Sequence, residues 1–165
     1  MERVIIIGCP GSGKSTFAKK LHDMTGLSLV HLDRLFWNEV GTTVEKEVFQ
    51  KRLSQALQGE TWIIDGNYGS TMEQRMKVCD TVIFLDYPTD LCLMGIRERR
   101  GKPRWDLPWI EPEEDDPTFV EFVKNYNTQN RPKVLELFRK YSHLNILCFT
   151  SREEAGAFLQ ELPLK

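Results

Sequence analysis

Residues 8–15 read GCPGSGKS and match the phosphate-binding pattern G-x-x-x-x-G-K-S/T at every fixed position. Residues 4–7 before the motif are a valine and three isoleucines, which is typical of a buried parallel strand. Residues 16–25 after it carry apolar side chains at helical spacing and end at Gly26, a common helix stop. The alternative is a chance glycine turn, but strand, glycine loop and helix are the context that the motif requires. We therefore expect a binding site for a nucleoside triphosphate.

The residue types of this loop indicate how it would hold phosphate. Glycines admit left-handed backbone conformations, so that successive N–H groups surround an anion, and the first helical turn adds free N–H groups. Lys14 is expected to reach the β- and γ-phosphates, and the Ser15 hydroxyl to bind Mg²⁺. The predicted nucleotide-binding residues are Gly8, Pro10, Gly11, Ser12, Gly13, Lys14, Ser15 and Thr16.

The rest of the chain alternates short apolar strands with helices. Strands are predicted at 27–32, 61–65, 81–85 and 144–149, and helices at 45–58, 71–78, 89–100, 118–141 and from 151 onward. We expect the helix over 118–141 to be kinked or interrupted near Pro132. Five strands alternating with helices predict one α/β domain over residues 1–165, with a parallel sheet covered on both faces. Ligands of such sheets bind at the carboxyl ends of the strands.

The composition limits the classes of function. A net charge of −2 gives no basic field for nucleic acid, so direct nucleic-acid binding is not expected. No apolar run approaches the length of a membrane span and no signal-peptide pattern is present, so we expect a cytoplasmic protein that does not bind membranes. Four scattered cysteines without a C-x-x-C pair indicate neither a zinc site nor a disulfide framework. The oligomeric state stays open.

Two aspartates lie at predicted strand ends. Asp65 follows an apolar strand and is predicted to hold Mg²⁺ together with Ser15, or else it caps the following loop. Asp33 ends the second strand. It is predicted to accept a proton from an acceptor hydroxyl or to orient that hydroxyl, or else it is the N-cap of the next turn.

A segment around residues 97–117 breaks the pattern, and we call it the lid. Five cations stand among residues 97–104, and four prolines stand at short intervals among residues 103–117. Mobile arginines that close over a transferring phosphoryl group would stabilise its charge, and we assign this role to Arg97, Arg100 and Arg104. The alternatives are a solvated helix end or a basic patch for nucleic acid. The acidic residues among 111–116 oppose the nucleic-acid alternative, and their pairing with the cations would hold the lid shut.

Several motifs resemble known families. Residues 8–15, the pair at 65–66, the arginine pair at 99–100 and the aspartate pair at 115–116 resemble the adenylate-kinase-like branch of phosphate-loop kinases. More narrowly, residues 31–37, 62–71 and 81–86 resemble DNA topology modulation proteins. The resemblance covers nearly the whole chain. It implies a five-stranded core of strand order 2-3-1-4-5, a lid between the fourth and fifth strands, and MgATP as phosphoryl donor.

The chain departs from adenylate kinases at three places. Where they have D-G-F-P-R, this chain reads DGNYG at 65–69, so the arginine that grips a nucleoside monophosphate is absent. Gly95 stands where they have an arginine, and acidic residues replace another arginine upstream of residue 115. A different hydroxyl or phosphate acceptor is expected, such as a nucleoside or another small metabolite.

The function expected from these observations is ATP-dependent phosphoryl transfer to a small acceptor. The acceptor pocket is predicted to contain Asp33, Arg34, Asn67, Tyr68, Arg75 and Arg131, although surface pairing is an equal alternative for the last two arginines. Tryptophans at 37, 105 and 109 and Tyr68 could stack on a ring, whereas the three histidines are expected to be structural or exposed. The alternative function is an ATP-dependent regulatory protein that binds DNA or a protein partner.

Overall fold

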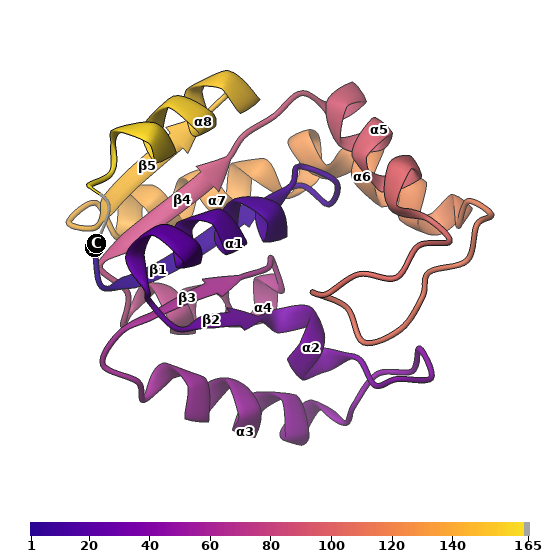
Figure 1. Cartoon of the computed structure of the whole chain (residues 1–165), viewed down its shortest axis with the longest axis horizontal. Helices are drawn as coiled ribbons and strands as arrows, with labels where there is room; N and C mark the ends of the chain where they lie inside the picture. The colour runs from indigo at the N-terminus through magenta and orange to yellow at the C-terminus, as the bar shows by residue number, and fades with distance from the viewer. Residues whose placement is uncertain (164–165) are drawn as a thin grey trace.

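A five-stranded parallel sheet of order β2-β3-β1-β4-β5 forms the middle of the molecule (Figure 1). The structure, a computed structural model, describes residues 1–163. In sheet order the strands are β2 Leu29–His31, β3 Trp62–Asp65, β1 Arg3–Gly8, β4 Thr81–Leu85 and β5 Asn145–Phe149. The predicted parallel sheet and its strand order are confirmed.

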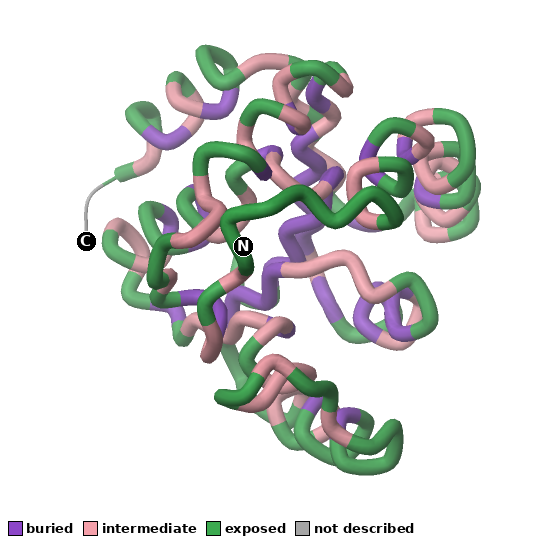
Figure 2. Tube along the Cα trace, turned by 90° about the vertical axis from the view of Figure 1, so that its right-hand side faces the viewer, coloured by how far each residue is buried: buried purple, intermediate pink, exposed green. Residues whose placement is uncertain are grey.

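The sheet is buried on both faces because its central strands are apolar on both sides. Residues 4–7 of β1 are fully buried, and their side chains alternate between two core clusters. One cluster packs against α1 Lys14–Thr25, α5 Thr89–Arg99, α6 Pro117–Gln129 and α8 Arg152–Glu161. The other packs against α3 Lys46–Leu57, α4 Gly69–Met76 and α7 Arg131–Lys140. Figure 2 shows the buried residues concentrated in the central strands and on the inner sides of the helices.

Most helix boundaries lie within two residues of those predicted. The helix predicted over 118–141 is divided at Asn130 into α6 and α7, with Pro132 in the first turn of α7, as expected for a residue that cannot continue a helix. Ser151 caps the start of α8, because the Glu154 backbone N–H donates to Ser151 Oγ at 3.1 Å.

The segment after β2 differs from the prediction. The strand predicted over 27–32 is shorter, and a five-residue helix, α2 Leu32–Phe36, follows it directly. Asp33 therefore lies inside the first turn of α2, and the N-cap is His31. The alternative of Asp33 as the helix cap is wrong, because its side chain is engaged elsewhere.

The lid runs without regular structure from the end of α5 to the start of α6 and reaches across to α2 (Figure 1). Arg34 Nε on α2 donates to the Trp105 carbonyl at 2.5 Å. The rings of Trp37 and Trp109 lie 5.3 Å apart, and Trp109 also packs on Gly41, whose φ of 78° suits glycine. The lid is therefore docked on α2 and on the turn that follows α2. Of the helices in the described part of the chain, none is long and apolar enough to span a membrane.

Gly95 brings the backbone of α5 against the phosphate loop. A Cβ on Gly95 would lie 2.1 Å from the Gly11 carbonyl oxygen, and one on Gly11 would lie 2.0 Å from that of Cys92. An arginine at position 95, as in adenylate kinases, is incompatible with this contact.

We predict that Gly95→Ala lowers the free energy of unfolding by about 1–3 kcal/mol, because the added methyl group overpacks a backbone contact. Alanine at an unhindered helical position instead stabilises by about 1 kcal/mol over glycine. Gly156→Ala on α8, where a Cβ would meet nothing within 4 Å, is the matched control. Urea denaturation measures both, and equal stability of Gly95→Ala and the wild type would contradict the contact.

Candidate functional site

The phosphate loop joins the end of β1 to α1, and glycine conformations give it its shape. Gly11 and Gly13 have φ of 83° and 89°, values that L side chains rarely adopt. The Ser12 N–H donates to the Cys9 carbonyl at 3.1 Å, and Lys14 Nζ donates to the same carbonyl at 3.2 Å. Burial lowers the pKa of Lys14, while the charges of Asp65 and Asp33 oppose that shift. The ammonium group thus feels the charge of two carboxylates and donates to one backbone carbonyl, which a phosphate oxygen can replace.

Asn67 anchors the start of the loop. Its Oδ1 accepts from the Gly8 N–H at 3.1 Å, and its Nδ2 donates to the Gly8 carbonyl at 2.5 Å. Sequence reasoning assigned Asn67 to the acceptor, but Gly8 engages both polar groups of its amide. Asn67 is therefore placed to position the phosphate loop.

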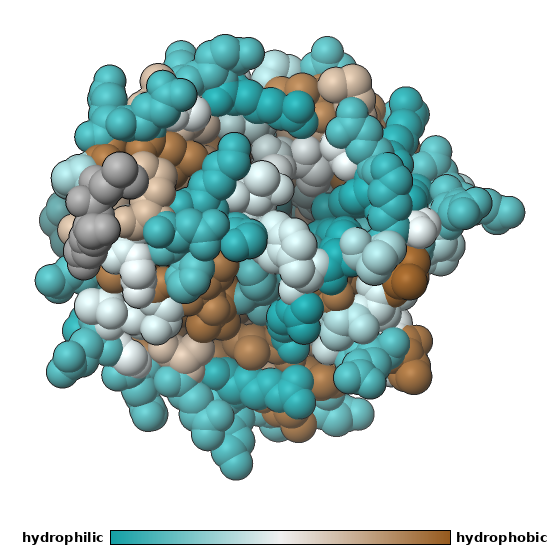
Figure 3. All heavy atoms as spheres, viewed as in Figure 1, coloured by the Kyte–Doolittle hydropathy of each residue, from teal (hydrophilic) through white to brown (hydrophobic). Residues whose placement is uncertain are grey.

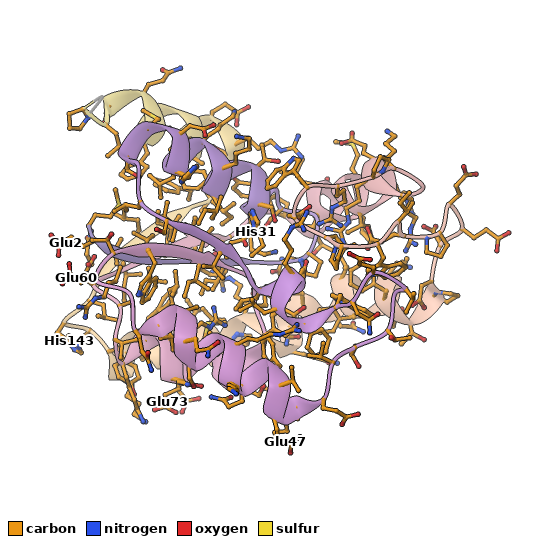
Figure 4. All side chains as sticks on the ribbon, turned by 60° about the horizontal axis from the view of Figure 1, so that its bottom comes forward. Glu2, His31, Glu47, Glu60, Glu73 and His143 are labelled. Carbon is orange, nitrogen blue, oxygen red and sulfur yellow. The ribbon has the colours of Figure 1, made fainter. Side chains whose placement is uncertain are left out.

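Asp65 lies at the end of β3 and is buried, with 3% of its surface exposed. His31 stands opposite it in the register of β2 and β3, and His31 Nδ1 lies 2.7 Å from Asp65 Oδ1. Since a carboxylate accepts, we assign the proton to Nδ1. In Figure 4 His31 lies toward the middle of the molecule, whereas His143 and the labelled glutamates lie at its edge. Sequence reasoning missed this pair, although Asp65 ends one predicted strand and His31 lies next to the end of another.

Asp33 forms a second pair, with Tyr68. The Tyr68 hydroxyl donates to Asp33 Oδ1 at 2.5 Å. Burial raises the pKa of Asp33 and the bond from Tyr68 opposes that rise, while burial and the Asp33 charge raise the pKa of Tyr68. Tyr68 has a φ of 39°, an uncommon value for a bulky residue, and its ring packs on Phe36 and Phe49 at 4.9 and 5.2 Å. Asp33 is thereby oriented with one oxygen free to accept a proton.

The lid cations pair with the lid acids, as predicted. Arg99 and Arg104 both contact Glu111, at 3.1 and 2.8 Å, and Arg100 contacts Asp115 at 3.1 Å. Arg104 also donates to both oxygens of Asp106.

Asp106 is a buried lid residue that sequence reasoning did not single out. Only 3% of its surface is exposed. Burial raises its pKa, but the hydrogen bonds and the charge of Arg104, together with a smaller contribution from the Ser15 hydroxyl, lower it overall. The lid thus brings a carboxylate, and the guanidinium that holds it, beside the predicted magnesium ligand of the phosphate loop.

These groups line one cavity of about 910 Å³, which is large enough for a nucleotide and a small acceptor. Figure 3 shows mainly hydrophilic side chains on the face viewed there, with hydrophobic ones gathered at its lower and right-hand parts. The predicted site residues in the lining are Pro10, Gly11, Gly13, Lys14, Ser15, Thr16, Asp33, Asp65, Asn67, Tyr68, Arg100 and Arg104. Gly8 and Ser12 belong to the loop without lining the cavity. Aromatic residues that the sequence left open, Trp37, Trp105 and Trp109, line it as well.

Four predicted arginines do not line the cavity. Arg97 is exposed, and Arg99 lines the cavity in its place, because residues two apart on a helix point in nearly opposite directions. Arg75 is fully buried and donates to the carbonyls of Gly66 and Asn67, and burial lowers its pKa to about 10.

The remaining two arginines are engaged at the surface. Arg131 pairs with Asp86, with Nε 2.8 Å from Oδ1, and this hydrogen bonding raises the pKa of Arg131. Arg34 holds the lid through the Trp105 carbonyl. The prediction that these arginines bind the acceptor directly is therefore not supported by their positions.

Known proteins are similar to this chain in sequence or in structure. No family model matches the chain. A curated adenylate kinase of Thermotoga neapolitana is 23% identical over 150 residues, covering 70% of this chain and 68% of the relative. The crystal structure of shikimate kinase from Bacteroides thetaiotaomicron aligns with a TM-score of 0.58 and 17% identity, covering 96% of this chain and 94% of that one.

The chain has a P-loop NTPase fold. The similarity to the adenylate kinase supports a small-molecule kinase of the P-loop type. The narrower resemblance to DNA topology modulation proteins stays a prediction, because neither match bears on it.

We predict that Asp33→Asn changes how stability depends on pH. Because the folded-state pKa of Asp33 is raised, the wild type should lose stability as the pH rises from about 4 through that pKa. Asparagine does not ionise, so the variant should gain stability relative to the wild type between about pH 4 and pH 7. Thermal unfolding over this range tests it. Asp23→Asn at an exposed site on α1 is the control, and parallel curves for wild type and Asp33→Asn would contradict the prediction.

Proposed function

We propose that the chain is an ATP-dependent phosphotransferase that moves the γ-phosphoryl group of ATP to a small acceptor. The observation that carries the proposal is the single cavity lined by Lys14, Asp33, Asp65 and the lid arginines Arg99 and Arg104. A phosphate-binding loop, two carboxylates and mobile guanidinium groups are the parts that phosphoryl transfer uses. The name of the adenylate kinase relative supports ATP as the donor.

Ser15 and Asp65 fit Mg²⁺. Hydroxyl and carboxylate oxygens are hard ligands of the kind that Mg²⁺ prefers, and Mg²⁺ usually combines one or two such groups with substrate phosphates. Both residues line the cavity, and the bond from His31 occupies only one oxygen of Asp65. When bound, the ion would neutralise charge on the phosphate oxygens.

The reaction that these groups support is an in-line displacement. The acceptor oxygen bonds to the γ-phosphorus while the bond from that phosphorus to the β,γ-bridging oxygen breaks, and the electron pair leaves with ADP. Where the acceptor is a hydroxyl, its proton goes to the free oxygen of Asp33. Lys14 exchanges the Cys9 carbonyl for phosphate oxygens, and Arg99 and Arg104 stabilise the charge of the transferred group.

The structure bears on the alternative, a regulatory protein that binds DNA. Nucleic-acid binding needs a basic stripe that is free to contact phosphates. Arg99, Arg100 and Arg104 instead pair with lid carboxylates. These three lid arginines are therefore not free to form such a stripe.

We predict that Lys14→Ala lowers ATP turnover at least about 100-fold with the fold intact, because it removes the cation that meets the β- and γ-phosphates. MgATP should raise the melting temperature of the wild type and not that of the variant. Lys20→Ala, an exposed position on the same helix, is the matched control and should behave as the wild type. Undiminished ADP release by Lys14→Ala in a coupled assay would reject the proposed function.

We predict that His31→Phe raises the Mg²⁺ concentration for half-maximal turnover about tenfold. Loss of the Nδ1 donor frees the Asp65 carboxylate to turn, and the loss of such orienting partners typically weakens metal sites 10–100-fold. Titration of Mg²⁺ at fixed ATP measures the shift. His143→Phe, at the edge of the molecule, is the control. An unchanged titration curve for His31→Phe would contradict the proposal that His31 orients the Asp65 carboxylate.

A further inference from the structure

One wall of the cavity is formed by aromatic rings. Phe36 and Trp37 of α2, Tyr68 after β3 and Trp109 of the lid all line it. Their rings contact one another in series, with 4.9 Å between Phe36 and Tyr68, 5.5 Å between Phe36 and Trp37, and 5.3 Å between Trp37 and Trp109. Such a wall suits a flat, largely apolar group.

Two carboxylates lie next to this wall. Asp33 bonds to Tyr68, a member of the wall, and Asp65 lies on the neighbouring strand end. Of the cavity cations outside the lid, Lys14 meets the ATP phosphates in the proposed function, and Arg152 begins α8, which packs on the other face of the sheet from Phe36 and Tyr68. Arg34 holds the Trp105 carbonyl and Arg75 holds loop carbonyls.

The lid cations do not supply an unpaired charge either. Arg99, Arg100 and Arg104 line the cavity, but each contacts a lid carboxylate at 3.1 Å or less. Opposite charges this close to one another offset the field that an anion would feel.

We propose that the phosphoryl acceptor is an uncharged or positively charged alcohol that carries a flat ring, and not an anionic compound. The inference rests on the proposed function and narrows its acceptor class. The ring lies along the wall of Phe36, Trp37 and Trp109, and the hydroxyl faces Asp33. An anionic group in the same place meets two carboxylates, while Arg99 and Arg104 are paired with Glu111 and Lys14 meets the ATP phosphates, so it binds more weakly.

The test uses acceptors matched in ring and hydroxyl that differ in charge. Hydroxymethylbenzylamine, benzyl alcohol and hydroxymethylbenzoate form one set, and nucleosides with their monophosphates form the other. Binding is followed by tryptophan fluorescence with a non-hydrolysable ATP analogue, and transfer by ADP release with MgATP. We expect the uncharged and cationic members to exceed their anionic partners at least about tenfold in both binding and kcat/KM.

The outcomes separate the two proposals. Equal or better use of the anionic members, with ADP released, overturns the acceptor class and leaves the kinase assignment standing. Ring alcohols that bind in the expected order without any ADP release reject the kinase assignment. Failure of every ring alcohol to bind overturns the acceptor class.

Two variants test the physical reasons. Asp33→Asn should strengthen binding of hydroxymethylbenzoate relative to benzyl alcohol several-fold, because it removes one of the two charges. Asp23→Asn should leave that ratio unchanged, and an unchanged ratio in Asp33→Asn overturns the electrostatic argument.

Trp109→Leu should weaken the binding of all ring alcohols about tenfold without weakening the binding of MgATP. Equal binding of the ring alcohols by this variant and the wild type overturns the role of the aromatic wall.

Discussion

The burial of β1 between two parallel neighbours is the constraint on which the site depends. β1 pairs with β3 on one side and with β4 on the other, and its residues 4–7 are inaccessible to solvent. The pairing sets Ile6 beside Asp65 and Gly8 beside Leu85. A slip of one residue would turn each apolar side chain to the opposite face, so the register is strongly specified. The same apolar contacts that hold the sheet together therefore place the phosphate loop next to the Asp65 carboxylate.

Backbone contacts then hold the phosphate loop open. Asn67 takes both polar groups of Gly8, and Gly95 lets α5 approach Gly11 more closely than any side chain would allow. Tyr68 keeps a left-handed conformation because aromatic packing holds its ring. Conformations of this kind cost about 1–3 kcal/mol and gather at functional sites. Favourable packing of the core thus offsets the cost of these strained conformations and keeps the phosphate loop in a shape that can bind an anion.

The lid is held by a different kind of interaction. It has no regular structure and contributes few core residues, but its cations and acids neutralise one another and two of its tryptophans dock on the segment around α2. Ion pairs that remain partly exposed contribute modestly and yield to a competing charge. In the proposed function, the γ-phosphoryl group of ATP is such a competitor. The shikimate kinase structure shares the fold of this chain. Because one fold can serve different functions, the side chains of the lid and the cavity are where such differences would arise.

The sequence by itself determined the phosphate loop, the five strands, their covering helices and the broken helix at Pro132, because glycine patterns, apolar periodicity and proline act locally. It also predicted the pairing of lid cations with lid acids, since the two blocks are close in the chain. Only the tertiary structure decided which side chains enter the cavity. Arg99 enters and Arg97 does not because of the angle around α5. Asn67, His31 and Arg75 find partners on neighbouring strands or loops. These partners depend on register and close packing between distant segments, which a pattern along one chain does not specify.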